Sequence, residues 1–284
     1  MKRTWKGYLF AGPLLLGFLL FYVLPFGQVV WDSLSQGTGK SQLFVGLENY
    51  SRMFQNDMFR MAFGNTLGFL GIGLPVILLV SYGLALFLKR QARRFQLLRT
   101  VFLLPYVMPV AGTVLLVDLL FSREGLVNQL FFALGLPLAD WLQSPAAFWV
   151  MLILYLWKST GYAVVLLLAG LMAIPPDHYA VAQVEGAGWW QAFRYITMPQ
   201  MWYALFIAFV FSLINAFKCF REIFLVGGEH PHPSVYMLQH FINNSFENLN
   251  YLRLSVASVL LFLVLTLVLG VCALWVLRKE AARS

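Results

Sequence analysis

Four charged side chains stand inside long apolar segments of this chain, where charge is unfavourable. Lys158 lies near the middle of the apolar window 146–174, and Lys218, Arg221 and Glu222 cluster in the second half of another window, 202–226. Because a charge that faced lipid would cost on the order of 3 kcal/mol or more, we expect these groups to face a helix bundle or a water-filled path. Such groups could bind the hydroxyls of a polar solute, or an anion, during transport.

The same residues also fit a purely structural network. Glu222 follows Lys218 by one helical turn, so these two side chains could pair with each other, while the long side chain of Arg221 could reach outward to the interface. The residue types alone leave both interpretations open. Asn215, one turn before Cys219, is a further candidate for the substrate path.

A turn-rich stretch, His230-Pro-His-Pro233, and the later His240 could suggest a metal site. The two prolines impose extended geometry, and Glu229 is the only carboxylate at a useful spacing. We therefore expect no metal here. The two cysteines fall in different apolar windows, which argues against a disulfide framework or a cysteine-based metal site.

The composition requires lipid as part of the solvent. Hydrophobic residues make up 60% of the 284 residues and charged residues only 11%, whereas a soluble domain has about 25% charged residues. A helix needs about 20 apolar residues to cross a membrane. We predict a single all-α membrane domain over residues 1–284 with six transmembrane helices, at about 7–30, 66–88, 100–121, 146–174, 202–226 and 254–277. The first apolar run exceeds a typical signal-peptide core, so we expect it to be retained.

The basic residues indicate the orientation of the spans, because positive charge gathers in cytoplasmic loops. Most Lys and Arg outside the spans lie before the first span, between spans two and three, between four and five, or after the sixth. Both termini and the segment 175–199 are therefore expected in the cytoplasm. The basic loop 89–99 and the net charge of +8 then need no nucleic-acid partner.

The segment 175–199 has the pattern of two short helices joined by a glycine turn. Two adjacent prolines and an aspartate suit the start of the first helix. Gly186 and Gly188 permit a sharp reversal, and Trp189 and Phe193 then share one face of the second helix. Two helices held at a fixed angle can transmit a push, although the residues fit an amphipathic connector on the membrane equally well.

This segment resembles the signature of the permeases of ATP-binding-cassette (ABC) importers, whose cytoplasmic loop carries an EAA…(D/E)GA…F…I…LP pattern. The chain has Glu185-Gly-Ala-Gly188 followed by Phe193, Ile196, Thr197 and Pro199 at the family's spacing. Further segments resemble the carbohydrate-importer permeases of that family: Phe44-Val-Gly-Leu-Glu-Asn-Tyr50, Arg99-Thr-Val-Phe-Leu-Leu-Pro105, Trp157-Lys-Ser-Thr-Gly161, Leu168-Ala-Gly-Leu-Met-Ala-Ile-Pro175 and the Gly227-Gly228 turn.

The resemblance implies a type I ABC importer permease, in which this cytoplasmic helix–turn–helix coupling loop docks in a groove of an ATPase subunit. The chain departs from the family where Ala180 replaces a usual Glu, Val181 a usual Ala and Met198 a usual Leu, so docking should depend more on packing and on Glu185. The residues that the resemblance implies for coupling to the ATPase are Tyr179, Ala180, Ala182, Glu185, Gly186, Ala187, Gly188, Trp189, Phe193 and Pro199.

The resemblance also implies partners and location. With six spans and no large insertion, the chain resembles the smaller first-permease type, which implies a second, paralogous permease. Two cytoplasmic ATPase subunits would carry ATP and Mg, so this transport subunit would be no enzyme and would bind no cofactor itself. A solute-binding protein, periplasmic or extracellular, would deliver a carbohydrate and touch the loop around His230-Pro-His-Pro233. The expected location is the inner (cytoplasmic) membrane of a bacterial cell.

In many sugar permeases the stretch matching Phe217 to Glu222 reads Phe-Gln-Val-Phe-Asp-Glu. Lys218 and Arg221 thus replace a neutral and an acidic residue, which leads to the hypothesis of an anionic carbohydrate. The alternative is a secondary active transporter of a small polar solute, built from repeats, but the two halves show no convincing similarity. An intramembrane enzyme is disfavoured because no Ser/His or Asp pair stands at catalytic spacing within the spans.

Overall fold

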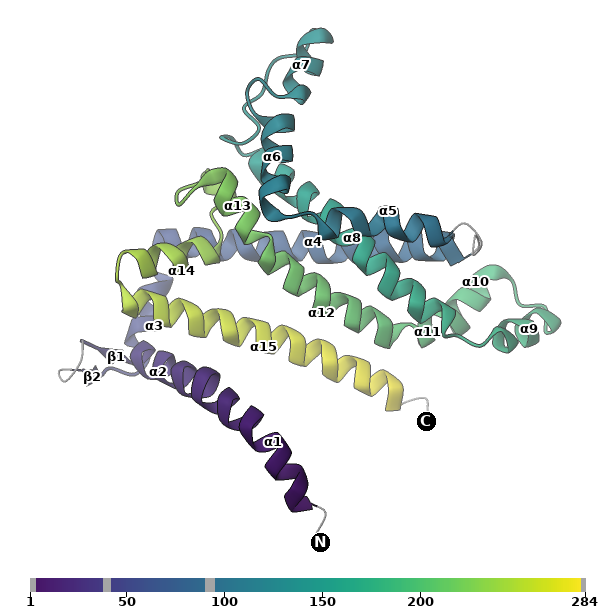
Figure 1. Cartoon of the computed structure of the whole chain (residues 1–284), viewed down its shortest axis with the longest axis horizontal. Helices are drawn as coiled ribbons and strands as arrows, with labels where there is room; N and C mark the ends of the chain where they lie inside the picture. Colours follow the sequence, from purple (N-terminus) through teal and green to yellow (C-terminus); the bar gives the residue numbers. More distant parts are fainter. Residues whose placement is uncertain (1–3, 38–41, 90–94, 282–284) are drawn as a thin grey trace. The chain divides into compact units, whose positions relative to one another are not determined.

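The computed structural model in Figure 1 describes residues 4–37, 42–89 and 95–281, and helices dominate it. Several basic residues used to orient the spans lie outside the described residues: Lys2, Arg3, Lys40, Arg90, Arg93, Arg94 and Arg283. The described elements in chain order are α1 (Thr4–Phe18), the π turn η1 (Leu19–Val23), α2 (Leu24–Ser33), β1 (Ser35–Gln36), β2 (Leu43–Phe44), α3 (Glu48–Phe54), α4 (Asp57–Lys89), α5 (Phe95–Val107), α6 (Val110–Phe121), α7 (Leu126–Ala133), α8 (Ala147–Met172), α9 (Pro176–Val184), α10 (Trp189–Ala192), the π turn η3 (Phe193–Thr197), α11 (Met198–Gln200), α12 (Trp202–Lys218), α13 (Phe220–Gly227), the 3-10 turn η4 (Pro233–Val235), α14 (Leu238–Glu247) and α15 (Tyr251–Ala281).

Five continuous helical segments of the described chain are long and apolar enough to cross a membrane. They are Phe10–Ser33, Asp57–Lys89, Ala147–Met172, Trp202–Gly227 and Tyr251–Lys279. A sixth candidate is the bent pair formed by Val101–Val107 and Val110–Ala133. The all-α membrane fold is confirmed, and the third span in chain order is the one bent by more than 40° in the described chain.

A continuous helix over 100–121 was expected, and the structure does not show one. The two parts of this span meet at 102°, and α6 and α7 run across the direction of α5 in Figure 1. Pro105 lies inside α5, and Pro109 stands before α6 with φ −58° and ψ 147°, which is extended backbone. Proline removes a helical donor and pushes the residue before it out of helical geometry, which explains the break at Met108.

The chain divides into two compact units. The first, residues 1–62 and 238–267, contains α1 to α3, the β1–β2 hairpin, α14 and the first half of α15. Asn49 in α3 is buried, and its side-chain amide donates to the carbonyl oxygens of Ser33 (3.0 Å) and Ser35 (2.9 Å). This contact joins α3 to the end of α2 and the start of the hairpin.

The second unit, residues 63–237 and 268–284, is centred on α8, which packs against α5 and α12. The approach of α5 depends on Gly161, because a Cβ atom there would overlap the carbonyl oxygen of Phe102. Small residues allow such close backbone contact between membrane helices. The Trp-Lys-Ser-Thr-Gly motif therefore fixes both a buried lysine and the position of the neighbouring helix.

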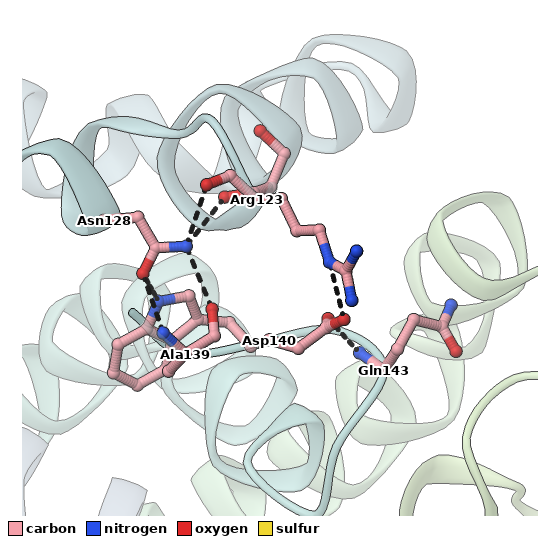
Figure 2. A network of polar contacts seen from close by, with 7 residues as sticks. Arg123, Asn128, Ala139, Asp140 and Gln143 are labelled. Carbon is pink, nitrogen blue, oxygen red and sulfur yellow. Dashed lines mark hydrogen bonds and ion pairs between the residues drawn. The ribbon is translucent and has the colours of Figure 1, made fainter. Parts of the chain in front are cut away.

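The connection between α6 and α8 is held by the polar contacts shown in Figure 2. The side-chain amide of buried Asn128 donates to the carbonyl oxygens of Arg123 (3.0 Å) and Ala139 (2.9 Å). Its Oδ1 accepts from the Ala139 N–H (3.2 Å) and from the Trp141 indole (3.0 Å), and Arg123 pairs with Asp140 at 3.1 Å. A single asparagine thus fixes a segment with little regular structure.

Two π turns each stand directly before a proline. In η1 the Leu24 N–H donates to the carbonyl of Leu19, five residues back, and Pro25 follows. The π turn η3 makes the same bond before Pro199. A proline ring clashes with the carbonyl of the preceding helical turn, and a wider turn relieves that clash. The helical path from the 175–199 loop therefore continues toward α12.

Candidate substrate path and coupling loop

A cavity of about 290 Å³ lies in the second unit, where the break between α5 and α6 faces α8 and the junction of α12 with α13. We call it the cationic cavity. It brings together all five residues that the sequence predicts for a substrate path, with an aromatic ring and a hydroxyl nearby. Its lining includes Tyr106, Met108, Pro109, Val110, Tyr155, Lys158, Ser159, Asn215, Lys218, Cys219, Arg221 and Glu222.

The buried charge of Lys158 is compensated from another helix. Its Nζ lies 2.6 Å from Glu222 Oε1 and 3.3 Å from Thr113 Oγ1, and the lysine and glutamate side chains are only 15% and 5% exposed. The sequence-based alternative paired Glu222 with Lys218, which is wrong. A buried ammonium needs an opposite charge far more than an exposed one does, and Lys218 is exposed.

Lys218 and Arg221 remain as uncompensated cations. Both line the cationic cavity and are exposed, and neither has a carboxylate within ion-pair distance among the described residues. Arg221 therefore contributes to the cavity wall. Glu222 Oε2 is buried and accepts no hydrogen bond from the described residues. The cavity wall thus carries excess positive charge beside one unused acceptor oxygen.

The 175–199 loop reverses direction at Gly186. Its φ of +78° is left-handed, and the Ala187 N–H donates to the carbonyl of Ala182 (2.8 Å) while the Gly186 N–H donates to that of Gln183 (3.1 Å). This is the Schellman arrangement that ends a helix, and glycine is favoured at its left-handed position. The signature Gly-Ala therefore has a backbone reason that is independent of any partner.

Gly188 plays a different part from the one expected. Its φ of −71° and ψ of 167° are open to any residue, and its N–H donates to the side-chain oxygen of Gln191 at 2.7 Å. Gly188 therefore starts the second helix, and the reversal depends on Gly186 alone.

One side of the loop is fixed to the membrane helices. The Tyr179 hydroxyl accepts a hydrogen bond from Nζ of Lys89, the last residue of α4, at 3.2 Å. The Phe193 ring stacks on Trp189, with centroids 5.6 Å apart, and lies 6.1 Å from the ring of Tyr82 in α4. Ala182 is buried. A force on this loop would therefore reach α4 as well as α12.

The other side of the loop is exposed and apolar. Val184 is 90% exposed, and Val181, about one helical turn earlier in α9, is exposed as well. Two of the predicted coupling residues, Ala180 in α9 and Glu185 directly after it, are also exposed. Exposed apolar residues grouped in this way are typical of a surface that another protein covers.

The sequence matches a known protein family and several of its members. Residues 73–279 match the family described as the binding-protein-dependent transport system inner membrane component. The trehalose/maltose transport system permease protein of Thermococcus litoralis is 30% identical over 262 residues, which cover 91% of this chain and 89% of that protein. The sulfoquinovosyl glycerol transport system permease protein of Agrobacterium fabrum is 30% identical over 261 residues, covering 90% and 84%.

A similar fold is found in a solved structure. One chain of a bacterial alginate ABC transporter, solved in complex with an alginate pentasaccharide-bound periplasmic protein, superposes with a TM-score of 0.79 at 23% identity. The match covers 95% of this chain and 93% of that chain. The overall arrangement of helices therefore has a precedent in a chain of a solved ABC transporter.

The chain belongs to the binding-protein-dependent transport system inner membrane component family. It is a membrane-spanning permease subunit of an ABC importer, with the type I permease fold, and it is a transport subunit rather than an enzyme. Two of the relatives that are similar in sequence are named for the transport of sugars. The secondary active transporter considered from the sequence is therefore set aside.

Proposed function

We propose that this permease imports an anionic carbohydrate through the cationic cavity. The observation that supports the proposal most directly is the pair of cations, Lys218 and Arg221, that line the cavity without a carboxylate partner among the described residues. Asn215 and Ser159 add groups that can bind sugar hydroxyls, and Tyr106 adds a ring against which a sugar can pack. A relative named for sulfoquinovosyl glycerol, a sulfonated glycoside, is consistent with this substrate class.

Uptake by cells that carry the whole importer tests the choice of an anionic sugar. The double variant Lys218→Gln/Arg221→Asp removes both uncompensated cations. We expect at least a tenfold loss of uptake of an acidic disaccharide and little change for a neutral one, because a hydrogen bond to a charged group contributes about 1.5–3 kcal/mol. Arg60→Gln, which removes an exposed cation of α4 that does not line the cavity, is the matched control. An equal loss for both sugars would contradict the proposal.

We further propose that the 175–199 loop couples this permease to a separate ATPase. The rigid attachment of the loop to α4 and its exposed apolar side support this role. The proposed assembly contains a second, paralogous permease, two cytoplasmic ATPase subunits that bind ATP and magnesium, and a solute-binding protein outside the cell. Both termini and the loop would then face the cytoplasm, and alternating access would be driven from there.

Val184 provides a test of this coupling surface, because it is exposed and lies away from the contacts with α4. We expect Val184→Asp to abolish copurification of the ATPase, since a charge would then be buried in the docking groove. Val184→Ala should retain most of it. A Val184→Cys variant should react with a membrane-impermeant thiol reagent only from the cytoplasmic side. Labelling from the outside would refute both the orientation and the coupling role.

A further inference from the structure

The first unit contains a second cavity whose chemistry differs from that of the cationic cavity. Its volume is about 790 Å³, and α2, the β1–β2 hairpin and the link between α14 and α15 form it. Its lining includes four carboxamides and one carboxylate, and none of its described lining residues is a lysine or arginine. We call it the amide cavity. The lining residues that matter here are Gln28, Asp32, Gln42, Asn248, Asn250 and Tyr251.

Asp32 is held in place by its neighbours. Its Oδ1 accepts hydrogen bonds from the side-chain amides of Gln28 (2.8 Å) and Gln42 (3.0 Å), and the Gln42 oxygen accepts from the indole of Trp31 (3.2 Å). Oδ2 of Asp32 accepts no hydrogen bond from the residues that the structure describes. A fixed carboxylate with one unused oxygen, flanked by amides that both donate and accept, is ready to bind hydroxyl groups.

Ser35 gives a second sign that the cavity is incomplete without a ligand. It lines the cavity, is only 2% exposed, and its hydroxyl has no hydrogen-bond partner within the described parts of the chain. A buried polar group without a partner is unfavourable by about 1–3 kcal/mol. A polar ligand that enters the cavity and donates or accepts there would remove that penalty.

Leu249 gives a third sign, because it has a conformation that leucine disfavours. Its φ is +54°, and the bonds from the Leu249 N–H to Phe246 and from the Asn250 N–H to Ser245 form a Schellman turn with leucine at the glycine position. The side chain lines the cavity and is 68% exposed. Backbone strain of this kind is concentrated at ligand sites.

We propose that the amide cavity binds a neutral saccharide unit. Side chains with fixed, planar oxygen and nitrogen groups can bind adjacent hydroxyls in pairs, and the ring of Tyr251 can pack against the apolar C–H face of a sugar ring. Since the described lining holds no cation, it gives no preference for a carboxylate or sulfonate. The proposal rests on the proposed carbohydrate transport, and it adds a binding site separate from the cationic cavity.

Binding of maltotriose to the full-length chain in lipid nanodiscs tests this site directly. Saturation-transfer NMR should show contact, and titration calorimetry should give an affinity. We expect Asp32→Ala and Gln42→Ala each to weaken binding at least tenfold. Tyr251→Phe should retain binding and Tyr251→Ala should lose it, which separates loss of the ring from general misfolding. Glu48→Gln, which removes an exposed carboxylate of α3 in the same unit, should leave the affinity unchanged.

The outcomes also separate this inference from the proposed function. Lys218→Gln/Arg221→Asp should leave maltotriose binding intact while it abolishes uptake of the acidic sugar. If the wild-type chain binds no maltotriose, or if Asp32→Ala leaves the affinity unchanged, the amide cavity is not a saccharide site, whatever the uptake assay shows. If instead maltotriose binding is lost with the Lys218 and Arg221 variant, the saccharide lies in the cationic cavity and the inference is equally overturned.

Discussion

The cationic cavity and the amide cavity offer a polar solute different kinds of contact. In the first, Lys218 and Arg221 supply charge that acts over several ångströms, while Lys158 is neutralised by Glu222. In the second, Asp32 is held by two amides, and recognition depends on short, directional hydrogen bonds. If both proposed sites bind sugars, net charge is selected at one place and the pattern of hydroxyls at another.

The largest expected effect comes from removing one member of the Lys158–Glu222 ion pair in the cationic cavity. In Lys158→Met, Glu222 is left buried without a cation, and we expect the free energy of unfolding to fall by about 3 kcal/mol or more. The double variant Lys158→Met/Glu222→Leu should recover most of that loss, because no isolated charge remains. Thermal unfolding in detergent measures both variants. A double variant no more stable than the single one would show that the pair is not what stabilises this cavity.

A change of pH should act on the first unit through His240 in α14. Burial lowers the pKa of His240 from 6.5 to about 4, so between these values the unfolded chain binds a proton that the folded chain does not. The contribution of neutral His240 to the free energy of unfolding is therefore fully present above pH 6.5. It is lost as the pH falls toward 4, by up to about 3 kcal/mol.

Thermal unfolding between pH 7.5 and 4.5 measures the effect of His240. His240→Gln should flatten the dependence on pH, and His178→Gln, which changes an exposed histidine of the 175–199 loop, should not. An unchanged pH profile in the His240 variant would assign the acid sensitivity to other groups.

The smallest expected effect concerns the two Schellman turns, at Leu249 and at Gly186. Leu249→Gly should raise the free energy of unfolding by about 1 kcal/mol, because glycine accepts the left-handed conformation. Gly186→Leu should lower it by a similar amount in the other turn. Chemical unfolding of both variants measures the difference. If Leu249→Gly stabilises the protein and also weakens maltotriose binding, the backbone strain at Leu249 is linked to the ligand. If Leu249→Gly leaves maltotriose binding unchanged, the turn is strained for another reason.

Much of the architecture could be predicted because its signals are local. Length and apolar composition place the spans, and Gly186 with the following alanine marks a helix end that backbone geometry requires. The gathering of Lys158, Asn215, Lys218, Arg221 and Glu222 at one cavity could be expected because charge avoids lipid.

The features that the sequence does not reveal depend on contacts between distant segments. The partner of Glu222 lies on α8, and the hydrogen bond of Lys89 joins the end of α4 to α9. Gln28 and Asn250 come from distant parts of the chain, and each is an ordinary polar residue near the end of a span. These two residues come together only in the folded structure, so no local sequence pattern could have predicted the amide cavity.

The π turn η3 lies ahead of the fifth span, with α11 and a turn at Met201 between it and α12, and it contributes to the direction in which the side chains of that span point. A π turn holds one residue more than an α turn, so everything after it is rotated by about 100° relative to an uninterrupted helix. Asn215 and Lys218 reach the cationic cavity from α12, several turns beyond η3. Gain or loss of one residue at η3 would therefore change which side chains of the fifth span face the cationic cavity, and with them the contacts that the proposed path offers to a solute.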